Sequence, residues 1–319
     1  MEALLNFQFM SRGFKIALLS FILSLPVWWG INNFQGELEK FFYAQISEPV
    51  QAMTFVEVPK ESSKPKLDIE AKSVISIKIN SAGKERTILN KNTNKILPIA
   101  SLTKLMAAVI VFENPSDYDF SKVLTVSKKA ESQDNVPNYG NLKAGDKYST
   151  EKLLNLTLAY SSNDAAFALA ENIGVENFVE KMNQKASELG LNNTHFSNPT
   201  GLDPEGLYYG TTTQGSFNYS TARDLSALAT FILNNRPEIF GISLEENGYK
   251  FENGVSEIVL PENEIMLGGK TGYTDEAGGC ILTCFYDKNG NHFINVVLGT
   301  ISPTERVVEM QKLVNWINI

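Results

Sequence analysis

Strand-like segments near both ends of the chain, with helical segments between them, constrain the fold more than any other feature of the sequence. Residues 73–89 contain two runs rich in β-branched side chains, separated by a turn with a glycine. Residues 280–298 contain two more such runs around an Asn-Gly step. The stretch from about 105 to 240 has mainly helical periodicity, and an amphipathic helix over residues 305–317 closes the chain. Strands from both ends must therefore pair in one sheet, which predicts an α+β fold with an inserted helical region.

A Ser-x-x-Lys motif, formed by Ser101 and Lys104, stands directly before the almost wholly apolar run 105–112. Residues three apart on a helix share a face, so the serine hydroxyl can meet the lysine amine. Serine is a weak nucleophile until a base takes its proton. Lysine can be that base only when burial or a nearby cation lowers its pKa. The motif therefore predicts a nucleophile and its base at the start of a buried helix.

Two further motifs follow in the chain. Ser161 and Asn163 form Ser-x-Asn, and Lys270, Thr271 and Gly272 form Lys-Thr-Gly. A Ser-x-x-Lys motif followed by these two is typical of penicillin-binding proteins and of class A β-lactamases. The three motifs together favour a serine acyl-transfer enzyme over a helix start with a solvated lysine.

The region from about 73 to 317 resembles the serine D-Ala-D-Ala carboxypeptidases, which are the low-molecular-mass penicillin-binding proteins. The resemblance includes longer stretches, at residues 99–106, 162–166, 198–203 and 219–224. It implies a five-stranded antiparallel sheet flanked by helices, beside an all-helical lobe, with the active site in the cleft between them. The chain departs from the family at Asn218, where His is common, and in a long connection over residues 205–218.

The resemblance implies catalytic roles for three residues. Ser101 would be the acylated nucleophile and Lys104 its general base. Ser161 would relay protons between Lys104 and the leaving amine. Asn163 would bind the amide of the substrate.

The resemblance also implies a set of residues that hold the substrate. Lys270 would keep the local field positive, and Thr271, beside Gly272 in the same motif, would bind the terminal carboxylate. The backbone N–H groups of Ser101 and Tyr273 would hold the oxyanion. We expect Arg306, after the last strand, to pair with the carboxylate, although a solvated position in the first helical turn is an equal alternative.

The implied substrate is a peptidoglycan stem peptide ending in D-Ala-D-Ala, and β-lactam antibiotics would be covalent inhibitors. The two histidines, His195 and His292, are far apart in the sequence, which argues against a Ser-His-Asp triad and a histidine-rich metal site. We expect no metal and no cofactor. The net charge of −8 gives no reason to expect nucleic acid as a partner.

Three other functions are alternatives for a chain that contains these motifs. An endopeptidase that cuts D-Ala cross-links would use the same residues. A class A β-lactamase needs Glu-x-x-Leu-Asn after Ser-x-Asn, but the matching string at residues 151–155 lies before Ser161. An inactive wall-binding protein would not require the three motifs intact.

The N-terminal part divides into two segments ahead of a catalytic domain at residues 71–319. Residues 1–31 contain an apolar run over residues 16–31 that follows Arg12 and Lys15, and the predicted membrane segment covers residues 14–31. The positive flank predicts an anchor in the cell membrane, with the catalytic domain on the extracytoplasmic side, or a secreted protein if the segment is cleaved. Residues 32–70 have the composition of a stalk or linker.

The two cysteines, Cys280 and Cys284, lie in one strand-like run. Four residues along a strand span about 13 Å, which is too far for a disulfide. We expect both to be buried thiols on one face of the strand.

Overall fold

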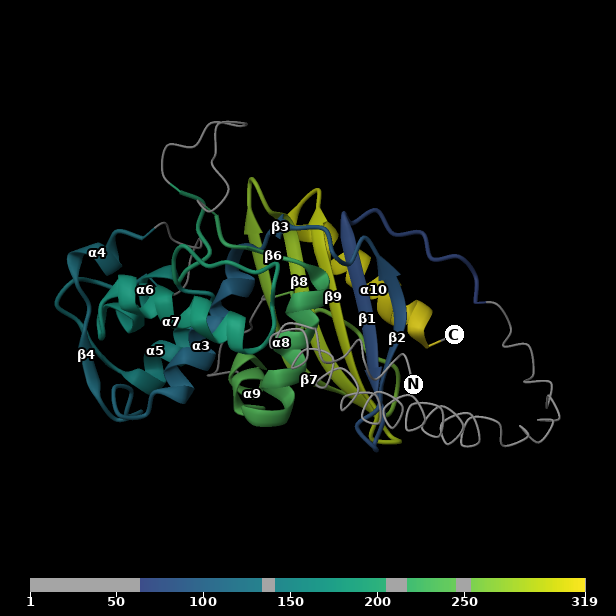
Figure 1. Ribbon diagram of the computed structural model, residues 1–319, viewed down its shortest axis with the longest axis horizontal. Helices are drawn as coiled ribbons and strands as arrows, with labels where there is room; N and C mark the ends of the chain where they lie inside the picture. Colours follow the sequence, from purple (N-terminus) through teal and green to yellow (C-terminus); the bar gives the residue numbers. More distant parts are fainter. Residues whose placement is uncertain (1–63, 134–140, 205–216, 245–253, 319) are drawn as a thin grey trace, which may run out of the picture. The chain divides into compact units, whose positions relative to one another are not determined.

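The computed structural model describes residues 64–133, 141–204, 217–244 and 254–318. Its centre is a five-stranded antiparallel sheet with the order β2-β1-β9-β8-β7. The strands are β1 (Ser73–Ile79), β2 (Glu85–Lys91), β7 (Glu264–Thr274), β8 (Gly278–Asp287) and β9 (His292–Thr300). Strand β1 lies against β9, which confirms that segments from the two ends of the sequence share one sheet (Figure 1).

Both faces of the sheet are covered, so its central strands are apolar on both sides. Helix α10 (Pro303–Ile317) packs against β8 and β9 on one face, where Phe285, Val297 and Leu313 share a core. Helix α8 (Ala222–Asn235) packs against β1 and β9 on the other face. Burial on both faces explains why these strands read as near-continuous apolar runs.

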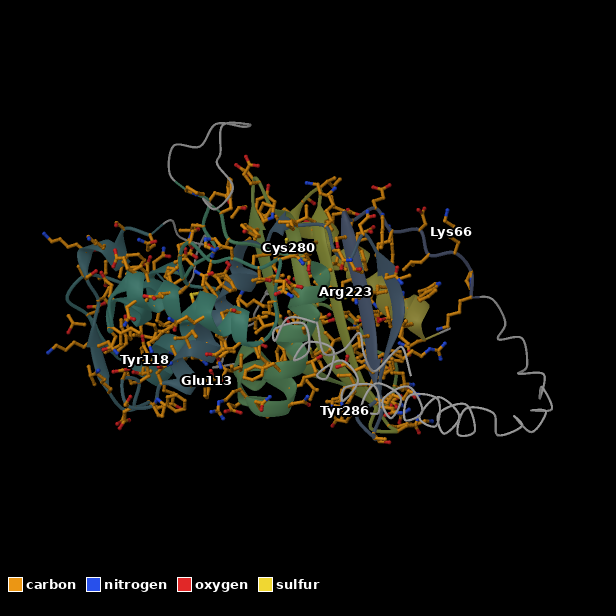
Figure 2. The ribbon with its side chains drawn as sticks, viewed as in Figure 1. Lys66, Glu113, Tyr118, Arg223, Cys280 and Tyr286 are labelled. Carbon is orange, nitrogen blue, oxygen red and sulfur yellow. The ribbon has the colours of Figure 1, made fainter. Side chains whose placement is uncertain are left out.

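The helical lobe beside the sheet is built around α3. It contains α3 (Thr103–Glu113), α5 (Thr150–Leu158), α6 (Asn163–Glu171) and α7 (Val175–Glu188), while α9 (Glu238–Leu244) packs mainly against β7. Tyr118, labelled in Figure 2, is buried in this lobe, where its hydroxyl donates to Leu169 O at 2.9 Å and its ring meets Phe178 edge to face. The lobe and the sheet confirm the α+β class and the architecture that the sequence implied.

Several short elements were not predicted. The polar stretch 113–150 contains a hairpin of β4 (Val123–Thr125) and β5 (Lys147–Ser149) and the single helical turn α4 (Lys128–Glu131). A second two-stranded pair joins β3 (Leu97–Pro98) to β6 (Tyr219–Ser220). Elements of two to four residues have too few positions to show a hydrophobic period, so the sequence could not reveal them.

Residues 64–70, which the sequence places in the stalk, pack along α10. The Lys64 ammonium donates to Ile317 O at 2.7 Å, and the indole of Trp316 donates to Pro65 O at 2.6 Å. The buried carboxylate of Glu309 accepts from the backbone N–H of Glu70 at 2.7 Å. The packed structure therefore begins before residue 71.

Residues 1–63 lie outside the described part of the chain, and with them the predicted membrane segment at 14–31 and most of the predicted stalk. Among the described residues, no helix combines the length and the apolar character needed to cross a membrane.

Cys280 and Cys284 are both free thiols, buried in β8 (Figure 2 labels Cys280). Both belong to the core cluster on the face of the sheet opposite α10. Burial raises the pKa of the Cys280 thiol to about 11, which keeps it protonated and unreactive. The prediction of buried thiols without a disulfide is confirmed.

Candidate active site

The three sequence motifs meet at one place, between the start of α3, the turn before α6, and β7. Lys104 links the first two, because its Nζ donates to Ser101 Oγ and to Asn163 Oδ1, each at 2.7 Å. Lys270 links the second and third, because its Nζ donates to Ser161 Oγ at 2.8 Å. Five of the residues predicted from the motifs therefore form two hydrogen-bonded groups, which meet at the turn before α6 that contains Ser161 and Asn163.

The backbone at Ser101 is held in an unusual conformation. Ser101 lies in the short 3-10 turn Ala100–Leu102 ahead of α3, and Ala100 before it has a φ of +47°. A non-glycine residue with positive φ is uncommon and costs of order 1–3 kcal/mol, so the surrounding packing must hold it there. The result is a partly exposed Ser101 side chain between two buried neighbours.

The turn before α6 presents Ser161 and Asn163 together. Ser162 caps the helix, since its Oγ accepts from the backbone N–H of Ala165 at 3.1 Å. This cap makes Asn163 the first helical residue. Ser161 has a φ of +57°, and its hydroxyl points to Lys270. Among the described residues no hydrogen bond joins Ser161 directly to Lys104, and the contact of the Ser161 hydroxyl is with Lys270 of the Lys-Thr-Gly strand.

Strand β7 approaches the turn at Ser101 closely at Gly272. A Cβ on Gly272 would lie 2.9 Å from Ser101 N and 3.1 Å from Ile99 O, so the position has no room for a side chain. Thr271, next to it, is buried, and Tyr273 is exposed. The close approach brings the backbone of the Lys-Thr-Gly motif beside the N–H group of the serine.

Arg306 reaches the same strand from α10. Its Nη1 donates to Gly272 O at 2.9 Å, while its buried Nε has no hydrogen-bond partner among the described residues. The side chain is therefore placed at the Lys-Thr-Gly strand and is not a solvated helix residue. The burial of an unpaired donor is costly unless a ligand supplies the acceptor.

Burial and nearby positive charges lower the pKa values of both lysines. The Lys104 ammonium is fully buried, and this burial, together with the positive charge of Lys270, holds its pKa well below the usual value. Burial and the nearby Arg306 lower the pKa of Lys270 to about 7. The lowered pKa of Lys104 favours the neutral amine, which is the form that a general base requires.

Sequence reasoning missed two partners of this cluster. The third hydrogen bond of Lys104 goes to the backbone carbonyl of Thr200, at 2.7 Å. Gly201, with a φ of +86°, lies against the serine turn, because a Cβ there would be 2.0 Å from Ala100 O. The Asn-Pro-Thr-Gly sequence signals a turn, but a backbone acceptor carries no side-chain identity that could reveal its partner.

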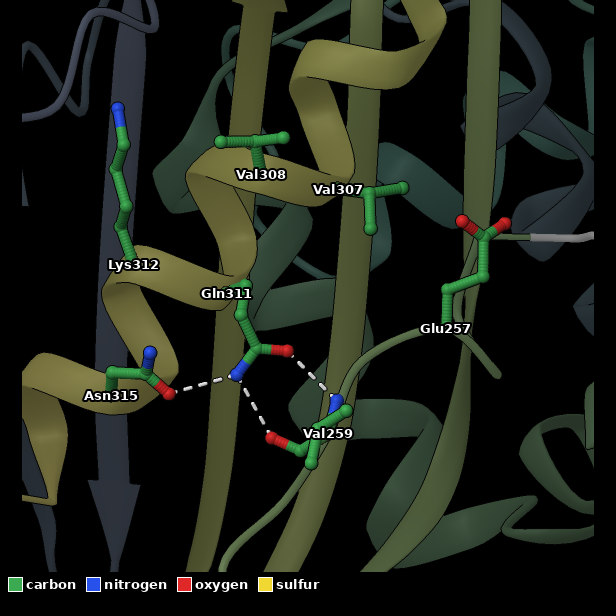
Figure 3. Close-up of a pocket in the computed structure, with 7 residues that line it drawn as sticks. All are labelled: Glu257, Val259, Val307, Val308, Gln311, Lys312 and Asn315. Carbon is green, nitrogen blue, oxygen red and sulfur yellow. Dashed lines mark hydrogen bonds between the residues drawn. The ribbon is translucent and has the colours of Figure 1, made fainter.

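A groove along the outer side of α10 contains no comparable cluster. The Gln311 amide pairs with both backbone groups of Val259, at 2.8 and 2.9 Å, beside exposed valines (Figure 3). None of the residues that line it was predicted for the site. The candidate active site therefore lies at the meeting point of the three motifs.

The five-stranded sheet, the helical lobe and this cluster of the three motifs are those of the penicillin-binding-protein class. A family model described as D-alanyl-D-alanine carboxypeptidase matches residues 59–302. The chain belongs to this family. The match stops short of Arg306, so the placement of that residue rests on the structure.

Three relatives illustrate the likeness. D-alanyl-D-alanine carboxypeptidase DacF of Bacillus subtilis is 33% identical over 260 residues, which cover 77% of this chain and 62% of the relative. A D-alanyl-D-alanine endopeptidase of Escherichia coli is 31% identical over 216 residues, which cover 61% of this chain and 64% of the relative. The crystal structure of penicillin-binding protein D2 from Listeria monocytogenes in its cefotaxime-bound form has a TM-score of 0.64 at 26% identity, covering 79% of this chain and 98% of that chain.

The chain matches only part of its curated carboxypeptidase relatives. It spans 62%, 54% and 56% of the length of three of them.

Proposed function

We propose that this chain is a serine D-Ala-D-Ala carboxypeptidase that removes the terminal D-Ala of peptidoglycan stem peptides through an acyl-enzyme on Ser101. The observation that carries the proposal is the hydrogen bond of 2.7 Å between Ser101 Oγ and the buried Lys104 Nζ. This contact places a base within hydrogen-bond reach of the serine, and burial of Lys104 together with the charge of Lys270 lowers the pKa of that base.

Acylation begins when neutral Lys104 takes the proton of the Ser101 hydroxyl. Asn163 Oδ1 and Thr200 O accept the two hydrogens that the neutral amine keeps, which leaves its lone pair directed at Ser101. The serine oxygen then forms a bond to the scissile carbonyl carbon. The backbone N–H groups of Ser101 and Tyr273 hold the resulting oxyanion, and such donors are worth about 2.7–4 kcal/mol each.

Collapse of the intermediate breaks the bond to the leaving D-Ala. The proton that Lys104 took from Ser101 passes to the leaving nitrogen through the Ser161 hydroxyl, which Lys270 orients. Water then attacks the acyl carbon, the bond to Ser101 Oγ breaks, and one water proton returns to the serine. Lys104 therefore acts as a base when it takes the serine proton and as an acid when that proton passes to the leaving nitrogen.

Recognition of a free terminal carboxylate is the role that we assign to Thr271, Lys270 and Arg306. Two cations and a buried hydroxyl side chain lie on or beside β7, next to the serine. The Nε of Arg306, which has no partner among the described residues, supports this assignment, because a carboxylate is the acceptor that a guanidinium binds best. The carboxylate of a β-lactam antibiotic would occupy the same place.

Labelled penicillin provides the test of the proposed nucleophile. We expect the full chain to form one covalent adduct, mapped by peptide mass spectrometry to Ser101, and the Ser101→Ala variant to form none. An adduct on another residue, or an unmodified chain at millimolar drug, would overturn the assignment. Rapid hydrolysis of the drug with no lasting adduct would indicate a β-lactamase instead.

An endopeptidase acting on D-Ala cross-links is the second candidate. The observation that favours it is the similarity to the Escherichia coli protein named for that activity. The two activities share the serine chemistry and differ in whether the substrate needs a free terminal carboxylate.

We also propose where the enzyme works. A peptidoglycan substrate requires a catalytic domain outside the cytoplasm, and the basic residues Arg12 and Lys15 before the apolar run 16–31 support a single N-terminal anchor in the cell membrane. Residues 32–63 would then separate the membrane from the catalytic domain. Cleavage of the N-terminal segment would give a secreted enzyme.

A further inference from the structure

Asn218 is a buried side chain outside the three motifs, and it is fully used in hydrogen bonds. It is only 3% exposed. Its Nδ2 donates to Thr103 Oγ1 at 2.9 Å and to Asn198 O at 2.8 Å. Its Oδ1 accepts from the backbone N–H groups of Ser197 and Asn198, at 2.8 and 3.1 Å. One amide therefore joins the start of α3 to the loop that contains Thr200.

The hydrogen bond to Thr103 connects Asn218 to the same turn at the start of α3 that contains Ser101 and Lys104. Thr103 lies between Ser101 and Lys104 in the sequence and is itself fully buried. The backbone of Asn218 adds a second tie, because its carbonyl accepts from the N–H of Ile99 at 3.2 Å. Asn218 thus contacts residues on both sides of the nucleophile.

The hydrogen bonds to Ser197 and Asn198 connect Asn218 to the 197–201 loop, which also contacts Lys104. Asn198 Oδ1 accepts from the N–H groups of Thr200 and Gly201, at 3.1 and 2.7 Å, which fixes the shape of the loop. In this shape the Thr200 carbonyl accepts from Lys104 Nζ at 2.7 Å. The position of that carbonyl relative to Lys104 is therefore set by the side chain that ties the loop to α3.

We propose that Asn218 is a positioning residue for the base, which holds the Thr200 carbonyl and the α3 start in register so that the Lys104 lone pair faces Ser101. The inference rests on the proposed function, because it concerns the same acylation step. Asn218 touches neither Ser101 Oγ nor Lys104 Nζ, so it acts through Thr103 and the 197–201 loop. Its loss should change the rate of the chemical step and leave noncovalent binding of the ligand unchanged.

The test compares Asn218→Leu with a matched variant, Asn183→Leu. Asn183 fixes the neighbouring residue Phe196 by the same kind of bonds, from its Nδ2 to Phe196 O at 2.8 Å and from Phe196 N to its Oδ1 at 2.9 Å. These two hydrogen bonds of Asn183 do not connect it to α3. Both variants remove one side-chain amide that fixes this loop, but only Asn218→Leu breaks the tie to Thr103.

The measurement is the concentration dependence of acylation by a labelled penicillin, which separates the acylation rate constant from the noncovalent dissociation constant. Asn218→Leu should lower the rate constant by about tenfold or more, with the dissociation constant unchanged within about threefold. Asn183→Leu should keep the parent's rate constant even if its melting temperature falls. Titration with the drug counts the folded molecules in each sample.

A second pair of variants covers the case in which Asn218→Leu does not fold. Thr103→Val removes the acceptor for Asn218 Nδ2, while Thr103→Ser restores a hydroxyl at that position. We expect Thr103→Val to lower the acylation rate constant and Thr103→Ser to recover most of it. A purely structural role for the network would lower the melting temperature of Thr103→Val without changing its rate constant, and that result would overturn the inference.

The outcomes separate this inference from the proposed function. A parent chain that is acylated at Ser101, with an Asn218→Leu variant acylated at the same rate, overturns the positioning role alone. A parent chain that forms no adduct at Ser101 overturns the proposed function and the positioning role with it.

Discussion

The Lys104→Arg variant is expected to lose acylation of Ser101 while it keeps its fold. Arginine cannot give up its proton at working pH, so it can preserve the positive charge but cannot accept the serine proton. General-base catalysis typically contributes about 10²–10⁴-fold to a rate, and the loss should fall in that range. Protonation of Lys104 has the same consequence, so the acylation rate of the parent should fall as the pH drops through the lowered pKa of this lysine.

Lys185→Arg is the matched control for this variant. Lys185 is a largely buried structural lysine, whose Nζ lies 2.7 Å from Glu113 Oε2 at the end of α3 and 2.8 Å from Glu188 Oε2. Arginine can keep such ion pairs, so the control should react with penicillin at the parent's rate. Stopped-flow acylation and thermal melting measure the two effects separately. A Lys104→Arg chain that acylates nearly as fast as the parent would show that another group is the base.

Gly201→Ala is expected to be the most damaging change outside the motifs. The new Cβ would lie 2.0 Å from Ala100 O and 3.0 Å from Ser101 N, and both are backbone atoms that cannot turn aside. The loop must retreat from the serine turn, and the Thr200 carbonyl must leave Lys104 with it. A displacement of about 1 Å at a reacting pair can cost about 10²-fold in rate, so we expect an acylation loss of at least that order.

Gly190→Ala is the control for backbone strain alone. Gly190, after α7, has a similar φ of +69°, but a Cβ there would meet nothing within 4 Å. It should cost about 1 kcal/mol of stability through its positive φ and leave the acylation rate unchanged. Acylation rates and melting temperatures of both variants check the difference. Parental acylation by Gly201→Ala would mean that the loop does not position Lys104.

The part of the fold that the sequence predicted is the part with long, strongly patterned elements. The strands near both ends and the buried helix after Ser101 each have seven or more residues of consistent pattern, and the structure contains them all. Short elements such as β3 and β6 depend on contacts between distant segments, here Pro98 with Tyr219. Local sequence does not encode such contacts.

In the candidate active site too, some residues could be predicted from the sequence and others could not. The motif residues Ser101, Lys104 and Lys270 could be predicted because their chemistry is carried by side chains in fixed spacings. Thr200 could not, since its contribution to the Lys104 contact is a carbonyl that every residue has. Asn218 appeared in the sequence only as a departure from the family, and its role depends on two segments that the fold brings together.

The most direct test of the account is the release of D-Ala from a pentapeptide stem that ends in D-Ala-D-Ala, compared with the same peptide amidated at its C-terminus. Amidation removes the anion that Thr271, Lys270 and Arg306 are proposed to bind, but it keeps the scissile bond. The account predicts release of a single D-Ala from the free acid, with kcat/KM for the amide lower by at least about tenfold, or about 1.4 kcal/mol. Equal turnover of the two peptides would contradict the carboxypeptidase and favour the endopeptidase.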